Sequence, residues 1–239
     1  MKDFYTIDYI ALFSLVFSWY GYSLYLKYAF KDKSRDNLFL VVYNLRRHWM
    51  HNFANQSTDP KIADAQMIAI LQRSLTFYIT ITVFIITGLM AMLSSSGTMV
   101  SVLNQLPYQV DNAQETITIK IMVMMSVFIF AFFKLSWSLR QSRYFSIAVF
   151  GLPETTKSHK NSHAIAEKLA LMSAITGRSF HNAYYAYYFG LSTLSWIVHP
   201  VIFIIVNFGV VAMLYRREFK SNALKVLAEI DDLYNETKS

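Results

Sequence analysis

The sequence predicts an all-α, polytopic integral membrane protein built as a helical bundle, and three observations support that class. Of its 239 residues, 54% are hydrophobic and 16% aromatic, which leaves too little polar surface for a soluble globule of this size. Four long segments are nearly free of charge, and the longest, residues 179–215, contains no Asp, Glu, Lys or Arg. Basic residues gather instead in the connections between these segments, as they do on the cytoplasmic side of a membrane.

Composition also excludes several classes of function. The chain has no cysteine, which excludes disulfide scaffolds, thiolate metal sites and cysteine nucleophiles. Its net charge of +7 fits anchoring against anionic lipid headgroups, and in so apolar a chain we expect no nucleic-acid partner. The sequence contains no phosphate loop, zinc-protease motif or nucleophile elbow, and the predicted spans contain no Asp or Glu. An ion-coupled pump of the carboxylate type is therefore disfavoured.

The first predicted span covers residues 9–26, which carry no charge and are long enough to cross a bilayer. After a basic stretch, apolar side chains recur at helical spacing: Leu38, Val42, Leu45, Trp49 and Phe53. Arg46 and Arg47 lie on the same helix but point away from this apolar face. Residues 35–55 therefore predict an amphipathic helix that lies on the cytoplasmic interface.

The next helix is predicted to begin at Asp59 and Pro60, an N-cap followed by a first-turn proline. It runs into the second predicted span, residues 74–96. Threonines within this span, together with Gly88, favour close packing against neighbouring helices.

Two lysines lie inside the third predicted span, residues 117–139. Lys120 and Lys134 are about 21 Å apart along a helix, so we expect each side chain to extend to its own interface. Residues 144–152 are too few to cross a membrane, and we expect them to lie at its surface as a separate piece. A second amphipathic helix is predicted at residues 162–177, where it ends at a glycine.

The long uncharged segment, residues 179–215, would extend about 55 Å as one helix, almost twice the thickness of a hydrocarbon layer. His199 and Pro200 interrupt it, because proline lacks a backbone donor and restricts the residue before it. If the break is a turn, the segment forms two spans, residues 179–198 and 201–215, and the chain crosses five times. If the break is a kink, the segment forms one long tilted helix and the chain crosses four times.

Charge sets the predicted orientation, because basic residues near short loops stay in the cytoplasm. The connections after the first and third spans are basic: Lys27, Lys31, Lys33, Arg35, Arg46, Arg47, Lys61 and Arg73 in one, and Arg140, Arg143, Lys157, Lys160, Lys168 and Arg178 in the other. Residues 95–119 hold no Lys or Arg, so the N-terminus is predicted outside. Arg216 and Arg217 then require a C-terminus inside, which only the turn provides, and we favour five crossings.

Candidate functional residues are mostly basic or aromatic. His48 and His51 lie three apart on the first amphipathic helix and are weak candidates for a metal site, since no acidic ligand is close in sequence. Lys134 suggests function because charge within a span is costly, although extension to the interface near Arg140 also explains it. Candidates for function or lipid contact are Arg46, Arg47, Trp49, Arg73, Lys134, Trp137, Arg140, His199, Arg216 and Arg217. We expect no catalytic residue, metal or cofactor.

Short motifs in a fixed order cover most of the chain: Trp19-x-Gly21-Tyr22, Arg46 with Trp49-Met50, Leu71-x-Arg73-Ser74, Phe130-Ala131-Phe132-Phe133-Lys134, Trp137-Ser138-Leu139-Arg140-Gln141, Tyr187-Tyr188-Phe189-Gly190-Leu191, His199-Pro200 and Leu214-Tyr215-Arg216-Arg217-Glu218-Phe219-x-Ser221. In these motifs the chain resembles the domain of unknown function 599 family, membrane proteins of bacteria and plants. The resemblance implies the membrane class. It implies no activity, because the family has no established activity.

We expect an integral protein of a bacterial inner membrane that is not an enzyme. It would act by contact, as an accessory or scaffold subunit of a larger assembly or as a homo-oligomer, with anionic lipid headgroups and membrane subunits as partners. One alternative is an oligomeric channel or carrier for an anion or small solute, lined by Lys134, Arg140 and Arg73. Another is an enzyme acting on lipid through His48, His51 and Lys134 near the cytoplasmic headgroups, although it lacks an acid to work with them.

Overall fold

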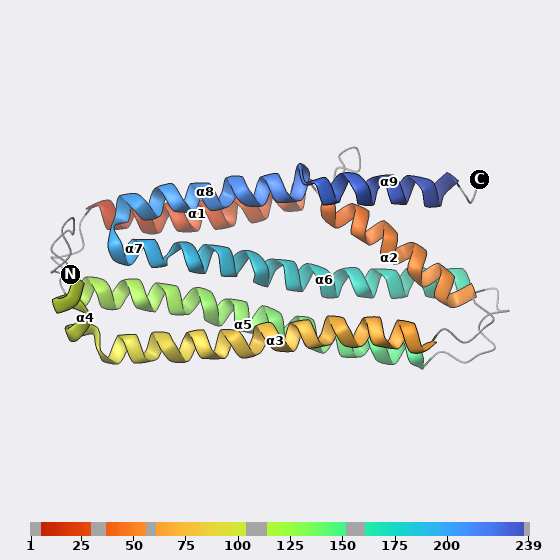
Figure 1. Ribbon diagram of the computed structural model, residues 1–239, viewed down its shortest axis with the longest axis horizontal. Helices are drawn as coiled ribbons and strands as arrows, with labels where there is room; N and C mark the ends of the chain where they lie inside the picture. The colour runs from red at the N-terminus through yellow and green to blue at the C-terminus, as the bar shows by residue number, and fades with distance from the viewer. Residues whose placement is uncertain (1–5, 30–36, 56–60, 104–113, 152–160, 237–239) are drawn as a thin grey trace. The chain divides into compact units, whose positions relative to one another are not determined.

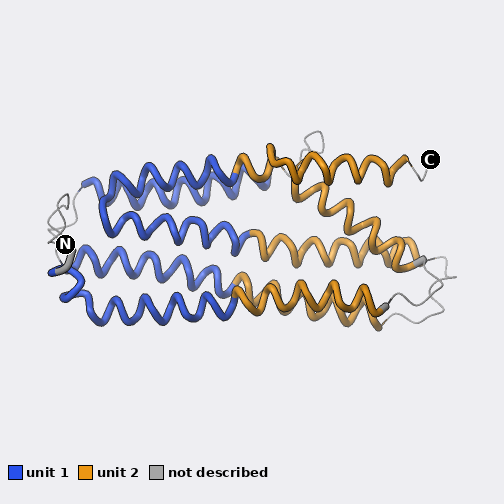
Figure 2. Tube along the Cα trace, in the orientation of Figure 1, with its two compact units in different colours: residues 1–28, 79–133, 182–214 blue, residues 29–78, 134–181, 215–239 orange. Residues whose placement is uncertain are grey.

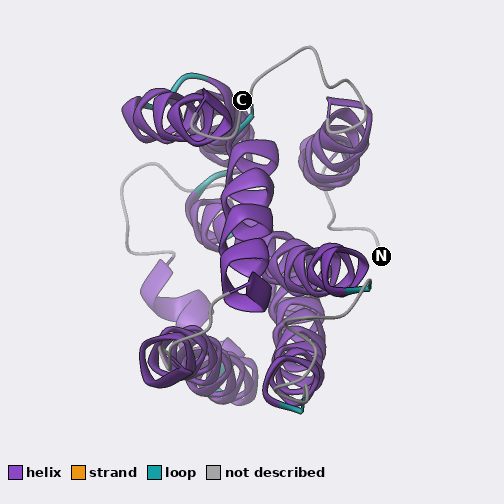
Figure 3. Cartoon of the chain, turned by 90° about the vertical axis from the view of Figure 1, so that its right-hand side faces the viewer, coloured by secondary structure: helices purple, strands orange, loops and turns teal. Residues whose placement is uncertain are grey.

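The computed structural model describes residues 6–29, 37–55, 61–103, 114–151 and 161–236, and within these ranges every regular element is a helix (Figure 1, Figure 3). The helices are α1 (Thr6–Ala29), α2 (Leu38–Asn55), α3 (Lys61–Ser94), α4 (Ser96–Leu103), α5 (Gln114–Phe150), α6 (Ser162–Ser192), α7 (Leu194–Val198), α8 (Pro200–Phe219) and α9 (Asn222–Glu236). The predicted all-α class is confirmed. The predicted cap at Asp59 and Pro60 lies outside the described residues, as do the basic residues Lys31, Lys33, Arg35, Lys157 and Lys160.

Four helical segments of the described chain are long and apolar enough to cross a membrane: Thr6–Ala29, Ile62–Ser94, Gln114–Phe150 and Pro200–Glu236. Many of their outward side chains are large and apolar, with Phe13 69% exposed and Phe84 71% exposed. Water opposes the exposure of so much apolar surface, whereas lipid tails accept it. The chain is therefore a multi-pass membrane protein.

The chain divides into two compact units, which Figure 2 shows in different colours. Unit 1 comprises Met1–Tyr28, Ile79–Phe133 and Asn182–Leu214, and unit 2 comprises Ala29–Tyr78, Lys134–His181 and Tyr215–Ser239. Helices α3, α5, α6 and α8 each contribute residues to both units. Each of the five predicted spans contributes a helical stretch to unit 1.

An apolar core in unit 1 joins α3, α5 and α7. Its buried side chains are Leu89, Ile117, Ile121, Met124, Phe128 and Ile197. The hydroxyls of Thr82 on α3 and Tyr187 on α6 also share a hydrogen bond in this unit. This contact is of the kind predicted for the threonines of the second span, whose hydroxyls can bond across to a neighbouring helix.

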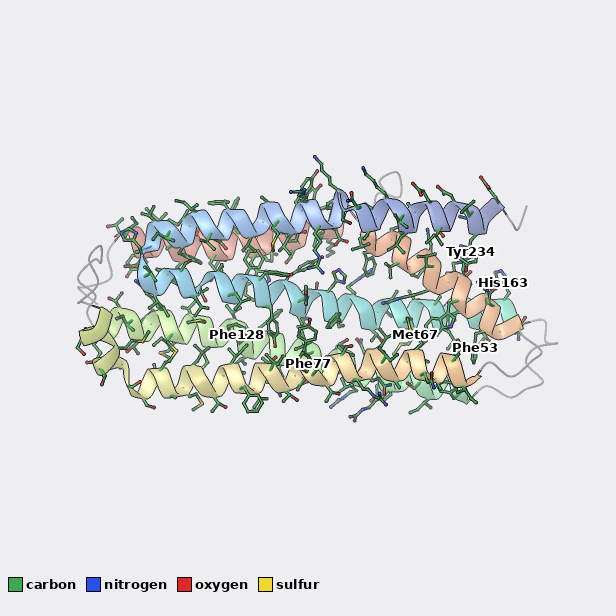
Figure 4. The ribbon with its side chains drawn as sticks, viewed as in Figure 1. Phe53, Met67, Phe77, Phe128, His163 and Tyr234 are labelled. Atoms are coloured by element: carbon green, nitrogen blue, oxygen red, sulfur yellow. The ribbon has the colours of Figure 1, made fainter. Side chains whose placement is uncertain are left out.

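Gly190 on α6 lies against the ring of Phe128, which Figure 4 labels. A Cβ at this position would lie 2.8 Å from Phe128 Cζ, and Tyr187 packs edge-on to the same ring. We expect Gly190→Ala to lower the free energy of unfolding by about 1–3 kcal/mol, because overpacking strains a filled core. Thermal unfolding in detergent measures the change. Gly209→Ala on α8 is the control, since its Cβ would meet no neighbour within 4 Å, and equal melting points for the two variants would contradict the close approach.

The uncharged segment breaks at His199. Helix α7 ends at Val198, His199 is extended (φ −158°, ψ 134°), and α8 begins at Pro200. Proline suits a helix start because its missing N–H is not needed there. His199 Nδ1 accepts a hydrogen bond from the backbone N–H of Val201, 3.1 Å away, and so satisfies one donor of the first turn of α8.

Contacts with α1 show that the chain reverses at this break. Ser18 and Tyr22 are one turn apart on α1. Ser18 Oγ accepts a hydrogen bond from Asn207 of α8 at 3.0 Å, whereas the ring of Tyr22 packs on Tyr185 of α6 with centroids 5.5 Å apart. One straight helix would hold Tyr185 and Asn207 about 33 Å apart. Within unit 1, α6 therefore runs opposite to α8 (Figure 1), as the turn interpretation requires, and the number of membrane crossings stays a prediction.

Five crossings place the two ends of the chain on opposite sides of the membrane, whereas four place them on the same side. Because the chain has no cysteine, single-cysteine variants at the exposed residues Thr6 and Glu236 report these sides directly. An impermeant thiol reagent on intact cells should label Thr6→Cys and should spare Glu236→Cys until the membrane is permeabilised. Labelling of both variants from the outside would contradict five crossings.

Helices α2, α3, α5 and α6 form the core of unit 2. Its buried side chains are Met50, Ala54, Ile68, Phe145, Val149, Ala166, Leu169 and Ala170. The amphipathic helices predicted at residues 35–55 and 162–177 thus pack against each other through their apolar faces.

Helix α5 is longer than predicted. The sequence ends the third span near residue 139 and makes residues 144–152 a separate piece, but α5 continues without a break to Phe150. The prediction that residues 144–152 form a separate piece is wrong. Phe145 and Val149 explain the difference, because both are buried in the core of unit 2 and extend the apolar face of α5 beyond the predicted span.

Helix α6 is also continuous where an end was predicted. It runs from Ser162 through Gly177 to Ser192, so residues 162–177 are its first half and not a separate helix. Gly177 does not end the helix. A Cβ at this position would collide with Nη1 of Arg46 on α2, so the glycine allows a close approach between two helices.

Helix α9 is an element that our sequence analysis did not predict. Ser221 Oγ accepts a hydrogen bond from the backbone N–H of Leu224, 3.1 Å away, as an N-cap does. The helix packs on α2 (Figure 1), where Asn44 Nδ2 donates to Asp231 Oδ2 at 2.8 Å. Leu224 and Asp231 are the buried residues of α9, so the side of the helix that carries them faces into unit 2.

Two side chains hold the start of α2. Asn37 Oδ1 accepts a hydrogen bond from the N–H of Leu40 at 2.8 Å, and Glu218 Oε1 accepts one from the N–H of Phe39 at 3.2 Å. Glu218 is buried at the end of α8. A carboxylate at a helix N-terminus satisfies unpaired donors and interacts favourably with the helix dipole. This contact fixes α2, which carries the candidate site described next.

Candidate functional site

Arg46 occupies the contact between α2 and α6 in unit 2. Its side chain passes over Gly177, and its Nη1 donates a hydrogen bond to the backbone carbonyl of Ser173 at 2.9 Å. Small residues one turn apart on α6 leave room for this approach. Within the described parts of the chain, no carboxylate lies within ion-pair distance of the Arg46 guanidinium.

The charge of Arg46 is therefore only weakly compensated. Burial lowers the pKa of Arg46 from its ordinary value. A guanidinium nevertheless keeps its proton in proteins, because its ordinary pKa lies above 12. A charged group that leaves water without a counter-charge is costly, so a bound anion would stabilise this arrangement.

Two pockets flank the Arg46 side chain, both within unit 2. The first encloses about 510 Å³ between α3, α5 and α6 and is lined by Arg46, Ile68, Leu71, Ser74, Leu75, Ser138, Ser142, Phe145, Ser173, Thr176, Gly177 and Phe180. The second encloses about 420 Å³ between α2 and α6 and is lined by Leu38, Phe39, Val42, Tyr43, Arg46, Ala174, Gly177 and His181. Both volumes include space that is open to solvent.

Five hydroxyl side chains line the first pocket, and three of them already have acceptors. Ser74, Ser138 and Thr176 donate hydrogen bonds to backbone carbonyls. The hydroxyls of Ser142 and Ser173 donate to no residue that the structure describes, although both side chains are buried. Two hydroxyl donors and a guanidinium therefore line one apolar pocket.

This set of groups has a defined chemistry. A guanidinium binds phosphate or carboxylate through two parallel hydrogen bonds, and nearby hydroxyls can donate to the remaining oxygens. Aliphatic and aromatic walls favour a ligand with an apolar part. The pocket suits an acidic amphiphile.

A buried ion pair lies in unit 1. Lys120 Nζ is 3.2 Å from Asp8 Oδ1, and the two side chains are 1% and 2% exposed. Trp196 Nε1 donates to the same oxygen at 2.8 Å, and its ring centroid is 5.9 Å from Lys120 Nζ. The three side chains join α1, α5 and α7. The prediction that Lys120 extends to the interface is wrong, because a carboxylate from α1 satisfies its charge inside the unit.

A family model described as "Protein of unknown function, DUF599" matches residues 10–223. The chain belongs to this family. No curated protein and no solved structure matches it.

In this DUF599 chain, the predicted residues beside Arg46 connect α2 to other helices. Arg47 Nε donates to Glu167 Oε1 of α6 at 2.5 Å. Trp49 Nε1 donates to Asp64 Oδ1 of α3 at 2.6 Å, and its ring meets Phe145 of α5. Both side chains therefore make contacts within unit 2.

The two histidines of α2 face different helices. His48 Nε2 is 3.1 Å from Asp231 Oδ1 of α9, and its ring stacks on Tyr234, which Figure 4 labels. His51 Nε2 is 2.9 Å from Glu167 Oε1 of α6. His48 and His51 therefore pair with separate carboxylates and do not form one site.

The other predicted residues of this DUF599 chain lie away from Arg46. Arg73 is exposed on α3, and Lys134 is partly buried on α5. The Arg140 guanidinium lies 5.7 Å from the ring centroid of Trp137, a cation–π contact at an exposed position. None of these four residues lines either pocket.

The remaining predicted candidates lie at the two ends of α8: His199 in the turn that precedes it, and Arg216 and Arg217 in its last turn. His199 accepts the N–H of Val201, so its observed role is in the turn. Arg216 and Arg217 are exposed in the last turn of α8, where cations interact favourably with the helix dipole.

Three residues of the Arg46 site were not predicted from the sequence. Ser142 was not singled out, and Ser173 and Gly177 were treated as part of an amphipathic helix and its end. The readable signal was the spacing of Ser173 and Gly177, two small residues one helical turn apart, which permits close approach of another helix.

Proposed function

We propose that this DUF599 protein is a non-enzymatic membrane protein whose unit 2 binds the phosphate of an anionic phospholipid at Arg46. The observation that carries the proposal is the part-buried Arg46 guanidinium, which has no carboxylate partner among the described residues and lines a pocket of about 510 Å³ that is partly open to solvent. Ser142 and Ser173 supply further donors for phosphate oxygens.

The position of the pocket along the chain supports a lipid over a free ion. Ser74 and Ser138 lie at or near the predicted ends of the second and third spans, where headgroups meet hydrocarbon. Leu71, Leu75 and Phe180 supply apolar walls for the first part of an acyl chain. A free anion would make no use of these walls.

A second proposal is an accessory or scaffold role, and α9 favours it. Val226, Ile230 and Leu233 are 55%, 37% and 61% exposed on this helix, whereas Leu224 and Asp231 are buried against unit 2. An exposed apolar face on a helix beyond the predicted spans is typical of an interaction surface, which a partner subunit or a second copy of this chain would bury. The anion-channel alternative has no comparable support, because Arg73 and Arg140 are exposed.

Native mass spectrometry tests both proposals with the full chain in nanodiscs of equal phosphatidylglycerol and phosphatidylcholine. We expect the released protein to retain phosphatidylglycerol in preference to phosphatidylcholine. Release with no preference between the two lipids would contradict the lipid-binding proposal. Spectra that contain only single chains, with no co-purifying subunit, would count against the scaffold role.

A further inference from the structure

Three ligand-forming side chains meet in unit 2, away from Arg46. His51 comes from the last part of α2, whereas His163 and Glu167 come from the first turns of α6. One ligand atom from each side chain lies within 4.8 Å of the other two. His51 Nε2 is 2.9 Å from Glu167 Oε1, and the rings of His51 and His163 have centroids 4.4 Å apart. Figure 4 labels His163 where α6 begins, beside the end of α2.

The local sequence explains why these groups converge. His163 and Glu167 are four residues apart, so they lie on one face of α6. Ala166 and Ala170 are fully buried on the same helix and let α2 approach closely at Met50. Next to Met50, His51 is then directed at the His163–Glu167 face. His163 and Glu167 lie far from His51 in the sequence, so no sequence motif indicates the cluster.

We propose that His51, His163 and Glu167 bind a divalent transition-metal ion of the zinc class, with water at the open position. Two imidazole nitrogens and one carboxylate are a donor set that such ions accept. Tetrahedral bonds of about 2.0–2.1 Å place ligand atoms roughly 3.3 Å apart. Separations of up to 4.8 Å in the cluster must therefore shorten, by at most about 1.5 Å, when an ion binds. His163 is exposed in the first turn of α6, where its side chain is free to change rotamer.

Arg47 supports the carboxylate ligand. It donates to Glu167 Oε1 at 2.5 Å, and Glu167 Oε2 has no hydrogen-bond partner among the described residues. Oε2 is thus available to an ion while Arg47 orients the group, as outer-shell partners do in metal sites.

The full chain, purified in detergent without a polyhistidine tag, is titrated with Zn²⁺ against a chromophoric chelator. We expect His163→Ala and Glu167→Gln to weaken Zn²⁺ binding by at least about 10-fold, since even outer-shell losses cost about that much. His48→Ala is the matched control: it lies on α2, pairs with Asp231 and contributes no ligand to the cluster, so it should bind as the wild type does. Co²⁺ should give a visible absorption spectrum of a low-coordinate site that is lost in His163→Ala.

Equal Zn²⁺ affinity in the wild type, His163→Ala and Glu167→Gln would overturn the metal site. So would an equal loss of affinity in His48→Ala. Circular dichroism of each variant confirms the helical content, and the exposed position of His163 makes its replacement mild for folding. Retention of phosphatidylglycerol by His163→Ala separates this site from the lipid site at Arg46.

Discussion

Replacing Lys120 by methionine is expected to lower the free energy of unfolding by about 3–5 kcal/mol, the cost of leaving one member of a buried ion pair without its partner. Only 2% of the Asp8 side chain is exposed, so water cannot replace the lost ammonium group. The Trp196 N–H remains as a donor to the carboxylate, but it carries no charge. Unfolding of the full chain in detergent, followed by circular dichroism, measures the loss.

A double variant separates charge from packing. Asp8→Asn combined with Lys120→Met removes both charges and keeps similar volumes, so it should recover most of the stability that each single variant loses. Lys134→Met on the same helix is the matched control, and because Lys134 is only partly buried its replacement should cost less. If the Lys120→Met variant melts at the same temperature as the wild type, the buried ion pair contributes nothing to stability.

Features that depend on neighbours along the chain were predictable from the sequence. An uncharged run of sufficient length crosses lipid whatever surrounds it, and the all-α membrane class follows from four such runs. Pro200 restricts the residue before it in any context, so the break at His199 was predictable too. Helix α9 also had readable signals: Ser221 as an N-cap, and Val226, Ile230 and Leu233 at helical spacing.

Features that depend on contacts between distant residues were not predictable. Asp8 precedes the first predicted span by one residue, and alone it resembles a terminal charge. Lys120 alone resembles a lysine at the membrane interface, and only the fold brings the two together. Gly177 alone resembles a helix end, because the Arg46 side chain that requires a small residue there comes from another helix.

In the Arg46 site, the charge of the guanidinium and its position can be tested separately. Arg46→Gln should weaken phosphatidylglycerol binding by about 30-fold or more, since losing one partner of a buried charged contact costs about 2 kcal/mol or more. The lipid-free variant should be as stable as the wild type or more so, because it removes a part-buried charge that has no carboxylate partner among the described residues. A guanidinium that served only to hold α2 on α6 would give the opposite result, a loss of stability with unchanged lipid affinity.

Two further variants make this test specific. Gly177→Ala keeps the charge but adds a Cβ that would collide with Arg46 Nη1, so it should displace the guanidinium from the Ser173 carbonyl and weaken lipid binding less than Arg46→Gln does. Arg73→Gln removes an exposed cation that lines neither pocket and should leave the dissociation constant unchanged. Titration of each variant with phosphatidylglycerol and with phosphatidylcholine gives the constants. If Arg46→Gln and Arg73→Gln lose affinity equally, the attraction comes from the overall positive charge of the protein and no lipid site exists at Arg46.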